Sequence, residues 1–139
     1  MPEEHRMFTV DEANRLVPTL GVLIPRLRQL RDAIVKEKDL HDVEEIASHG
    51  TAGKAAQTAR EAMDQLQKNI RRKEREFEKE LKFFEETGCE LKGIEPGLVD
   101  FYSDREGEMV YLCWMEKEAS VRFWHPISGG YAGRHPIDE

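Results

Sequence analysis

The feature that most constrains the fold is an apolar repeat in the first third of the chain. The steps between apolar residues alternate between three and four: Ala13, Leu16, Leu20, Leu23, Leu27, Leu30 and Ile34. This spacing places them on one side of an α-helix and is typical of helices that pack along a narrow seam. Thr9 and Glu12 before the repeat match a capping box, in which each side chain accepts from a free backbone N–H. We therefore predict a helix that begins near residue 9.

Two prolines lie inside this repeat, and an interior proline costs roughly 3 kcal/mol in a helix. Pro18 and Pro25 are seven residues apart, so both lie on one face, away from the apolar stripe. We expect one long helix bent at the prolines. The repeat loses phase after Lys36, and two alternatives stay open there. Asp39 caps a short extra helix, or the first helix continues to the next glycines.

A second apolar series follows Gly50 and Gly53 and predicts a second long helix. Its members are Ala56, Ala59, Met63, Leu66, Ile70, Phe77, Leu81 and Phe84, with Lys73 at one position of the stripe. Gly88 follows the last turn, where a left-handed cap favours glycine. The two series predict an antiparallel, coiled-coil-like helical hairpin over residues 9–87, with its tip near 48–53.

The last fifty residues have the pattern of β-strands. The runs 97–102, 109–115 and 120–125 are separated by turn residues, and the middle run is apolar on both faces, as in a central strand. Leu91 is a candidate for another short strand. We predict an antiparallel meander of three or four strands over 89–139 that ends in a glycine-rich loop. The whole chain, 1–139, is then a single α+β domain in which a small sheet packs with the hairpin.

Composition narrows the function classes. The chain has 139 residues and a net charge of -7, and this sign disfavours general binding to nucleic acid or anionic membranes. Its apolar runs are too short to span a membrane, and its first residues lack the layout of a signal peptide. Cys89 and Cys113 show no metal-site spacing and suit a reducing compartment. We expect a cytoplasmic protein.

Several short motifs occur in an order that resembles a known family. They are Phe8-Thr9-x-x-Glu12-Ala13-Asn14-x-x-x-Pro18, Gly97-Leu98-Val99-Asp100-Phe101, Leu112-Cys113-Trp114, Phe123-Trp124-His125 and Tyr131-Ala132-Gly133-Arg134-x-Pro136. Together they cover nearly the whole chain, which resembles the uncharacterised bacterial family called domain of unknown function 2203 (DUF2203). The resemblance implies a small cytoplasmic bacterial protein, and it implies no activity.

The densest polar cluster lies in the C-terminal part. Asp100, Glu118, His125 and Arg134 are candidates for binding a small anionic ligand, because arginine clamps carboxylates or phosphates and histidine exchanges protons near neutral pH. His125 and His135, with Asp100 or Glu118, are candidate ligands of a divalent metal. The structural alternative is an ion pair between Asp100 and Arg134, with His125 capping the sheet edge. No residue is assigned a catalytic role.

Two further sets lie in the expected hairpin. His41, Glu45 and His49 are spaced four apart, so an unbroken helix would present them to a metal on one face. The basic run 68–75 is a candidate contact for nucleic-acid phosphates, but glutamates follow it at helical spacing. A solvated, ion-paired face is the better interpretation, and no cofactor is assigned.

Three functions follow from these patterns. The first is a non-enzymatic interaction module that self-associates, with a dimer favoured, because two long helices expose more apolar stripe than the C-terminal part covers. The second is a protein that binds a small anion or a metal, or an enzyme, through the C-terminal polar cluster. The third is nucleic-acid binding through the face Lys68–Arg75.

Overall fold

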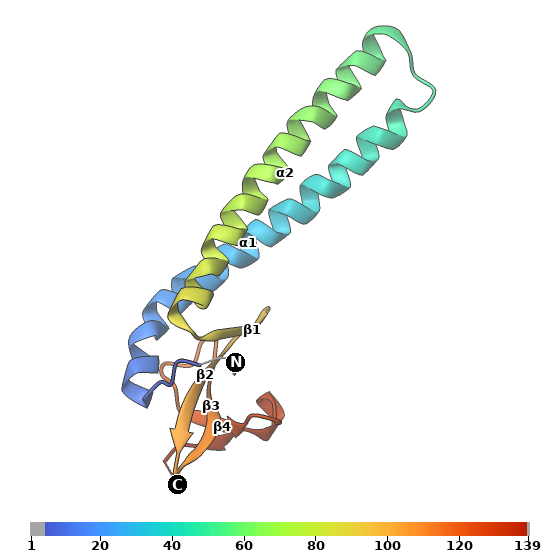
Figure 1. The fold of residues 1–139 in the computed structure, drawn as a ribbon. Coiled ribbons are helices and arrows are strands. Elements are labelled where there is room, and N and C mark those ends of the chain that lie inside the picture. The colour runs from blue at the N-terminus through green and yellow to red at the C-terminus, as the bar shows by residue number, and fades with distance from the viewer. Residues whose placement is uncertain (1–4, 139) are drawn as a thin grey trace. The chain divides into compact units, whose positions relative to one another are not determined.

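The computed structural model describes residues 5–138 and contains two long helices, five strands and one short 3-10 helix (Figure 1). The chain divides into two compact units. The sheet unit comprises Met1–Arg26 and Leu81–Glu139, and the hairpin unit comprises Leu27–Glu80. The predicted α+β class, with a helical hairpin and an antiparallel sheet, is confirmed. Within residues 5–138, no helix is both long and apolar enough to cross a membrane.

The first helix, α1 (Val10–Ser48), is continuous and contains both prolines. The capping box forms as predicted. The backbone N–H of Thr9 donates to Glu12 Oε1 over 2.9 Å, and that of Glu12 donates to Thr9 Oγ1 over 3.1 Å. Pro18 is exposed, so water can solvate the carbonyl group that it leaves without a helical partner. Since α1 passes through Asp39 without a break, the alternative of a separate capped helix is wrong.

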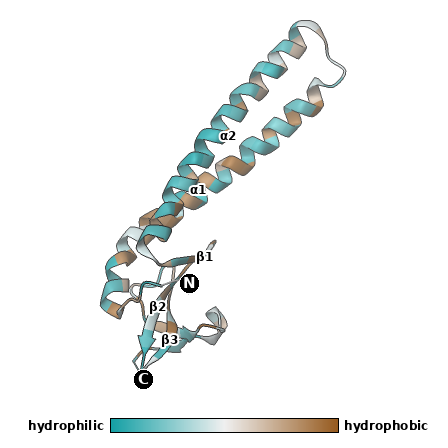
Figure 2. Ribbon diagram, viewed as in Figure 1, coloured by the Kyte–Doolittle hydropathy of each residue, from teal (hydrophilic) through white to brown (hydrophobic). Residues whose placement is uncertain are grey.

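The second helix, α2 (Gly53–Thr87), is followed by the predicted glycine cap. Gly88 has a φ of 88°, in the left-handed region, and its N–H donates to the Phe84 carbonyl over 3.0 Å. The hairpin tip lies between Ser48 and Gly53, as expected. Figure 2 shows apolar segments recurring along α1 in the hairpin unit, whereas α2 is mostly hydrophilic there.

The two helices contact each other within the hairpin unit through few apolar groups. Ile70 is buried, but Lys73, which occupies an apolar position of the repeat, forms an ion pair with Glu37 of α1. One turn further toward the tip, Gln67 Nε2 lies 3.1 Å from His41 Nε2. The seam is therefore partly polar.

Five antiparallel strands lie in sequence order: β1 (Glu90–Ile94), β2 (Gly97–Arg105), β3 (Glu108–Met115), β4 (Phe123–Pro126) and β5 (His135–Pro136). The apolar run predicted as central is β3. The expectation of three or four strands misses β5, which pairs His135 with Trp124. Two residues, one of them proline, are too short to show a strand pattern within the glycine-rich loop, where the 3-10 helix η1 (Tyr131–Gly133) also lies.

One face of the sheet is apolar and joins the start of α1. Phe101 is fully buried, and its ring meets the Phe8 ring edge-on at 5.2 Å. Asn14 Oδ1 accepts from the Val121 N–H over 2.6 Å, which ties the loop before β4 to the helix. Gly97 is required by close approach, because a Cβ there would lie 2.8 Å from Ile24 Cγ2.

Candidate functional site

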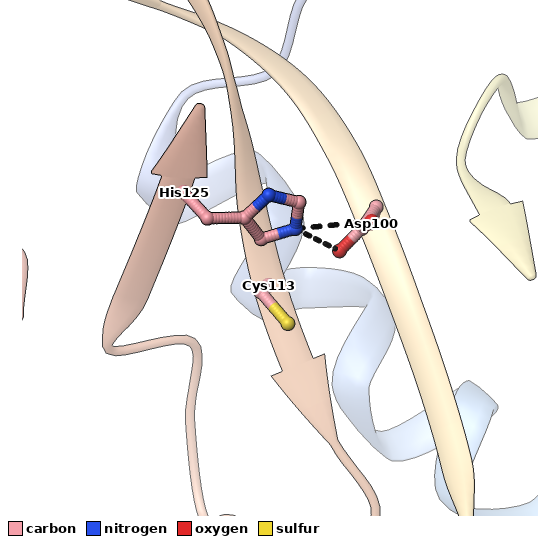
Figure 3. A group of neighbouring side chains, drawn as sticks. All are labelled: Asp100, Cys113 and His125. Carbon is pink, nitrogen blue, oxygen red and sulfur yellow. Dashed lines mark hydrogen bonds and ion pairs between the residues drawn. The ribbon is translucent and has the colours of Figure 1, made fainter. Parts of the chain in front are cut away.

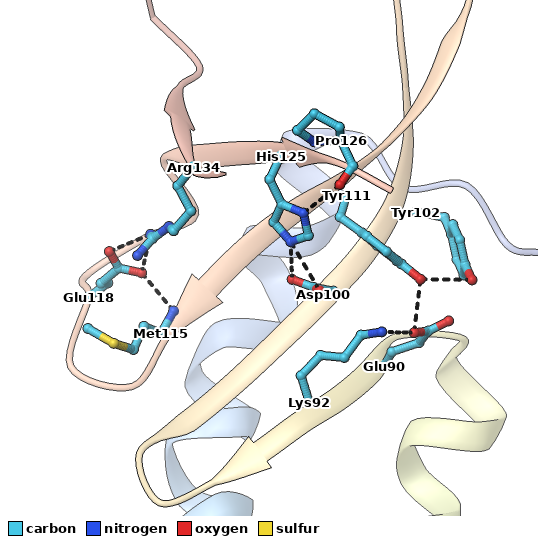
Figure 4. A network of polar contacts seen from close by, with 10 residues as sticks. All are labelled: Glu90, Lys92, Asp100, Tyr102, Tyr111, Met115, Glu118, His125, Pro126 and Arg134. Carbon is cyan, nitrogen blue, oxygen red and sulfur yellow. Dashed lines mark hydrogen bonds and ion pairs between the residues drawn. The ribbon is translucent and has the colours of Figure 1, made fainter. Parts of the chain in front are cut away.

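The opposite face of the sheet carries polar groups. Side chains alternate along a strand, so the residues next to the buried apolar ones point the other way. This polar face comprises Asp100 and Tyr102 of β2, Tyr111 and Cys113 of β3, and His125 of β4 (Figure 4). None of the five is more than 8% exposed. Burying so many polar groups is costly unless each one finds a partner.

At the centre of this face are Asp100, Cys113 and His125, one from each of three adjacent strands (Figure 3). Asp100 and Cys113 are opposite each other in the β2–β3 register, and His125 is opposite Tyr111 in the β3–β4 register. His125 Nε2 lies 3.1 Å and 3.2 Å from the two carboxylate oxygens of Asp100. The register of the strands thus brings the three side chains together.

The other ring nitrogen of His125 fixes the orientation of the imidazole. Nδ1 lies 2.8 Å from the Pro126 carbonyl oxygen, which can only accept a hydrogen bond. Nδ1 therefore carries a hydrogen and donates it. In a neutral ring, Nε2 then presents a lone pair to the Asp100 carboxylate, so a proton or a cation is needed between these two acceptors.

The surroundings of Cys113 favour its thiol over its thiolate when no cation is bound. Burial, together with the negative charge of Asp100, raises its pKa to about 12, although Arg134 acts in the opposite direction. Burial also raises the pKa of the Cys89 thiol. Since the thiolate is the nucleophile, neither residue fits a reactive cysteine near neutral pH.

Arg134 and Glu118 form a second pair at the edge of the polar face. Arg134 Nη2 donates to both carboxylate oxygens of Glu118, over 2.8 Å and 2.7 Å. The guanidinium also lies over the rings of Phe123 and Tyr131, at 3.9 Å and 4.6 Å from their centroids. The alternative of an Asp100–Arg134 ion pair is wrong, because Arg134 forms its ion pair with Glu118.

Asp100 instead contacts His125. The structural alternative in which His125 caps the sheet edge is also wrong, because His125 is buried inside the sheet. It lies on β4, between β3 and β5, and is 2% exposed. The two acidic side chains of the predicted cluster therefore each lie against another member of the cluster, Asp100 against His125 and Glu118 against Arg134.

A third group closes the face toward β1. The Tyr111 hydroxyl donates to Glu90 over 3.1 Å and lies 2.9 Å from the Tyr102 hydroxyl. Lys92 pairs with the same Glu90 carboxylate over 2.8 Å. Partial burial alone would raise the pKa of Glu90, but hydrogen bonds from Lys92, Tyr102 and Tyr111 lower it below its usual value.

Four of the predicted site residues lie on or beside this face, and one does not join them. His135 is exposed on β5, and its ring centroid lies 4.9 Å from that of Trp124 with the two rings tilted by 33°. Among residues 5–138, the metal-capable group at this face consists of Asp100, Cys113 and His125, without His135. Sequence reasoning missed Cys113 because it considered cysteine spacing along the chain. The alternation of side chains along β3 could have identified it, because this alternation places Cys113 on the opposite face from Leu112.

In the hairpin unit, the residues that form the second candidate metal site differ from the predicted set. The ligand atoms of His41, Asp42 and Glu45 lie within 4.8 Å of one another, and His49 is not part of this group. Asp42 and Glu45 are exposed. In the basic run, Lys68 pairs with Asp64 of the same helix over 3.8 Å at the exposed surface, whereas Lys73 pairs with Glu37 of α1 in the partly buried seam.

Comparison with known proteins decides the family. The sequence model of the family described as "Uncharacterized conserved protein (DUF2203)" matches residues 6–137. The chain belongs to this family. No curated protein and no solved structure matches it. In this DUF2203 protein, three residues of the motifs that carried the resemblance make contacts that hold the sheet unit together: Asn14, His125 and Arg134.

Proposed function

We propose that this protein is a non-enzymatic interaction module that forms a homodimer through one side of α1 in the hairpin unit. The proposal rests on a stripe of large apolar side chains that is exposed on this side of α1. Val35, Leu40, Val43 and Ile46 are 53%, 46%, 61% and 70% exposed. We call this stripe the outer face, because Glu37 and His41, which contact α2, lie on the other side of the helix.

The hairpin unit has almost no core of its own. Of the apolar residues that are buried in the described part of the chain, only Leu27 and Ile70 belong to residues 27–80. Burial of apolar area stabilises by roughly 25 cal/mol per Å². Covering the exposed stripe would therefore stabilise the hairpin unit, which buries little apolar area of its own.

The charges beside the stripe favour a second copy of the chain as its occupant. A shallow hollow on the outer face is lined by Asp32, Val35, Lys36, Asp39, Leu40 and Val43. A two-fold axis between positions 37 and 38 maps this set onto itself. In an antiparallel pair of helices, Val35 then meets Leu40 of the other copy, and Lys36 meets Asp39. Such an isologous contact pairs apolar with apolar and opposite with opposite charge at these positions, and it places Asp32 beside Val43 of the other copy.

An anion-binding function has weaker support. The guanidinium of Arg134, which an anion would use, already binds both oxygens of Glu118 and is 8% exposed. We further propose a bacterial cytoplasmic location, which the two free, buried cysteines support.

Sedimentation equilibrium of the full chain over micromolar concentrations tests the dimer. We expect a monomer–dimer equilibrium in the wild type and a monomer in Val43→Asp. The matched control is Val22→Asp, which changes an even more exposed valine of α1 in the sheet unit, at 73% against 61% for Val43. This control should dimerise like the wild type. A strictly monomeric wild type, or equal loss in both variants, would contradict the proposal.

A charge exchange tests the register. Lys36→Asp and Asp39→Lys should each weaken the dimer, because each places like charges opposite one another across the interface. The double variant, Lys36→Asp with Asp39→Lys, restores both pairs and should recover dimerisation. If the double variant is as monomeric as the single variants, the antiparallel register is wrong.

A further inference from the structure

We propose that Asp100, Cys113 and His125 form a binding site for one divalent metal ion of the zinc class on the polar face of the sheet. Their ligand atoms, a carboxylate oxygen, a sulfur and a ring nitrogen, all lie within 4.8 Å of one another. They come from three adjacent strands, so the backbone hydrogen bonds of the sheet hold their spacing (Figure 3).

The donor set selects the class of metal. Zinc binds thiolate, imidazole and carboxylate at about 2.0–2.3 Å, which puts its ligand atoms roughly 3.3–3.8 Å apart. The distances from His125 Nε2 to Asp100 are 3.1 Å and 3.2 Å, close to this range before any adjustment. Calcium and magnesium prefer sites made of oxygen alone, so a sulfur and a nitrogen donor disfavour both.

The orientation of His125 is the second observation that points to a metal. Metal-binding histidines usually donate their other ring N–H to a carboxylate or a backbone carbonyl, which fixes the tautomer and aims the free lone pair. Nδ1 of His125 makes this bond to the Pro126 carbonyl over 2.8 Å. Nε2 is then directed toward Asp100 with its lone pair available.

Charge balance agrees with a divalent ion. Metal binding would displace the Cys113 thiol proton to solvent, so the bound carboxylate and thiolate would carry two negative charges where Asp100, Cys113 and His125 are 3%, 0% and 2% exposed. One divalent ion neutralises them. The rival arrangement places an extra proton on the His125–Asp100 pair and leaves Cys113 as a thiol, which needs no metal.

Three protein ligands leave one coordination position for water or a small ligand, as in zinc sites that are not purely structural. Because the three side chains are buried, the ion would enter as the sheet forms, and its binding would contribute to folding stability. The site belongs to the sheet unit, so it does not depend on the proposed dimer.

The test is refolding of the full chain with zinc or with cobalt(II), followed by removal of free metal. We expect one equivalent of zinc per chain by mass spectrometry. In the cobalt form we expect a thiolate-to-cobalt charge-transfer band. Cys113→Ser should remove the band and reduce the zinc content to background. Cys89→Ser is the matched control, because Cys89 is also buried in the sheet unit but lies outside the group, and it should keep both signals.

Asp100→Asn separates metal binding from the rival proton-linked pair. The asparagine amide can donate to His125 Nε2, so this variant should fold even if Cys113→Ser does not. Loss of zinc from folded Asp100→Asn supports the site. Zinc retained by Asp100→Asn or by folded Cys113→Ser would overturn it. So would a wild type that refolds with zinc and holds none, or zinc that is lost with His41→Ala in the hairpin unit.

Discussion

The two units depart in opposite ways from the usual partition of polar and apolar side chains. The sheet unit buries an aspartate, a histidine and two tyrosines together on one face of its sheet, while the hairpin unit gathers four exposed large apolar side chains on one side of α1. Large apolar side chains are exposed in the sheet unit too, but they are spread over several elements. In the sheet unit the polar groups are drawn together by strand register. In the hairpin unit the apolar groups lie outside because one seam cannot cover two sides of α1. The first departure points to a ligand inside the unit, and the second points to a partner outside it.

The largest difference between the units should appear in core truncations. Phe101→Ala removes a fully buried ring from the sheet unit and should cost about 3–5 kcal/mol in free energy of unfolding. Phe77→Ala removes the same side chain from a half-buried position of the hairpin unit and should cost clearly less. Urea unfolding of both variants measures the contrast. Equal costs would mean that the hairpin is as well packed as the sheet.

The second largest effect on stability should come from the hydrogen bond that joins α1 to the loop before β4 in the sheet unit. Asn14→Ala leaves the Val121 N–H without its acceptor and should destabilise by about 1–3 kcal/mol. Asn69→Ala, on α2 of the hairpin unit, removes only a bond from Gln65 on the same helix and should be near neutral. Thermal unfolding of the two variants gives the comparison, and a neutral Asn14→Ala would remove the structural role assigned to that residue.

The ion pair between Glu37 and Lys73 in the hairpin seam gives the third contrast. Glu37→Leu leaves Lys73 without its partner and should cost roughly 1–2 kcal/mol, since the pair is only partly shielded from water. The double variant, Glu37→Leu with Lys73→Leu, restores an apolar seam and should equal or exceed the wild type in stability. A double variant less stable than the wild type would show that the ion pair stabilises the seam more than apolar packing does.

The smallest effect depends on pH. Glu90→Gln loses the charged partner of Lys92 and Tyr111 and should cost roughly 1 kcal/mol at neutral pH, after screening by water. Because the pKa of Glu90 is lowered from 4.5 in the folded state, its contribution is fully present above that value. It is lost as the pH falls through the folded-state value.

The difference in unfolding free energy between wild type and Glu90→Gln should therefore shrink in acid. Glu108→Gln, an exposed glutamate of β3, is the control and should show little difference at any pH. A gap for Glu90→Gln that stays constant into acid would contradict the lowered pKa.

The sequence predicts the helices better than the site. The seven-residue repeat, the Thr9–Glu12 box and Gly88 are local signals, and each is observed at its predicted place. The pairing of charges is not local. Glu118 follows β3 and Arg134 follows η1, so the approach of these two segments decides which acid Arg134 binds. The sequence identified Glu118 as a site residue, but its prediction of Asp100 as the partner of Arg134 was wrong.

The same limit explains Cys113 and β5. A cysteine that joins an aspartate and a histidine across three strands shows no spacing along the chain, and a two-residue strand shows no alternation. Both follow from the sheet once its register is fixed. The exposed stripe also differs from the predicted one: the seven-residue repeat of α1 is buried or half-buried, and the exposed apolar residues lie mostly beyond the point where the repeat loses phase.

The most direct test of the account is a distance between two copies of the chain. In the proposed antiparallel dimer, the two copies of position 47 lie 19 helical positions apart, or about 28 Å along the helix axis at 1.5 Å per residue. With roughly 9 Å between the helix axes, nitroxide labels on Ala47→Cys lie about 30 Å apart. Pulsed electron spin resonance should give one distribution centred near this length, which disappears when Val43→Asp is added. A short distance, as in a parallel pair, or no dipolar coupling at all would contradict a self-complementary outer face.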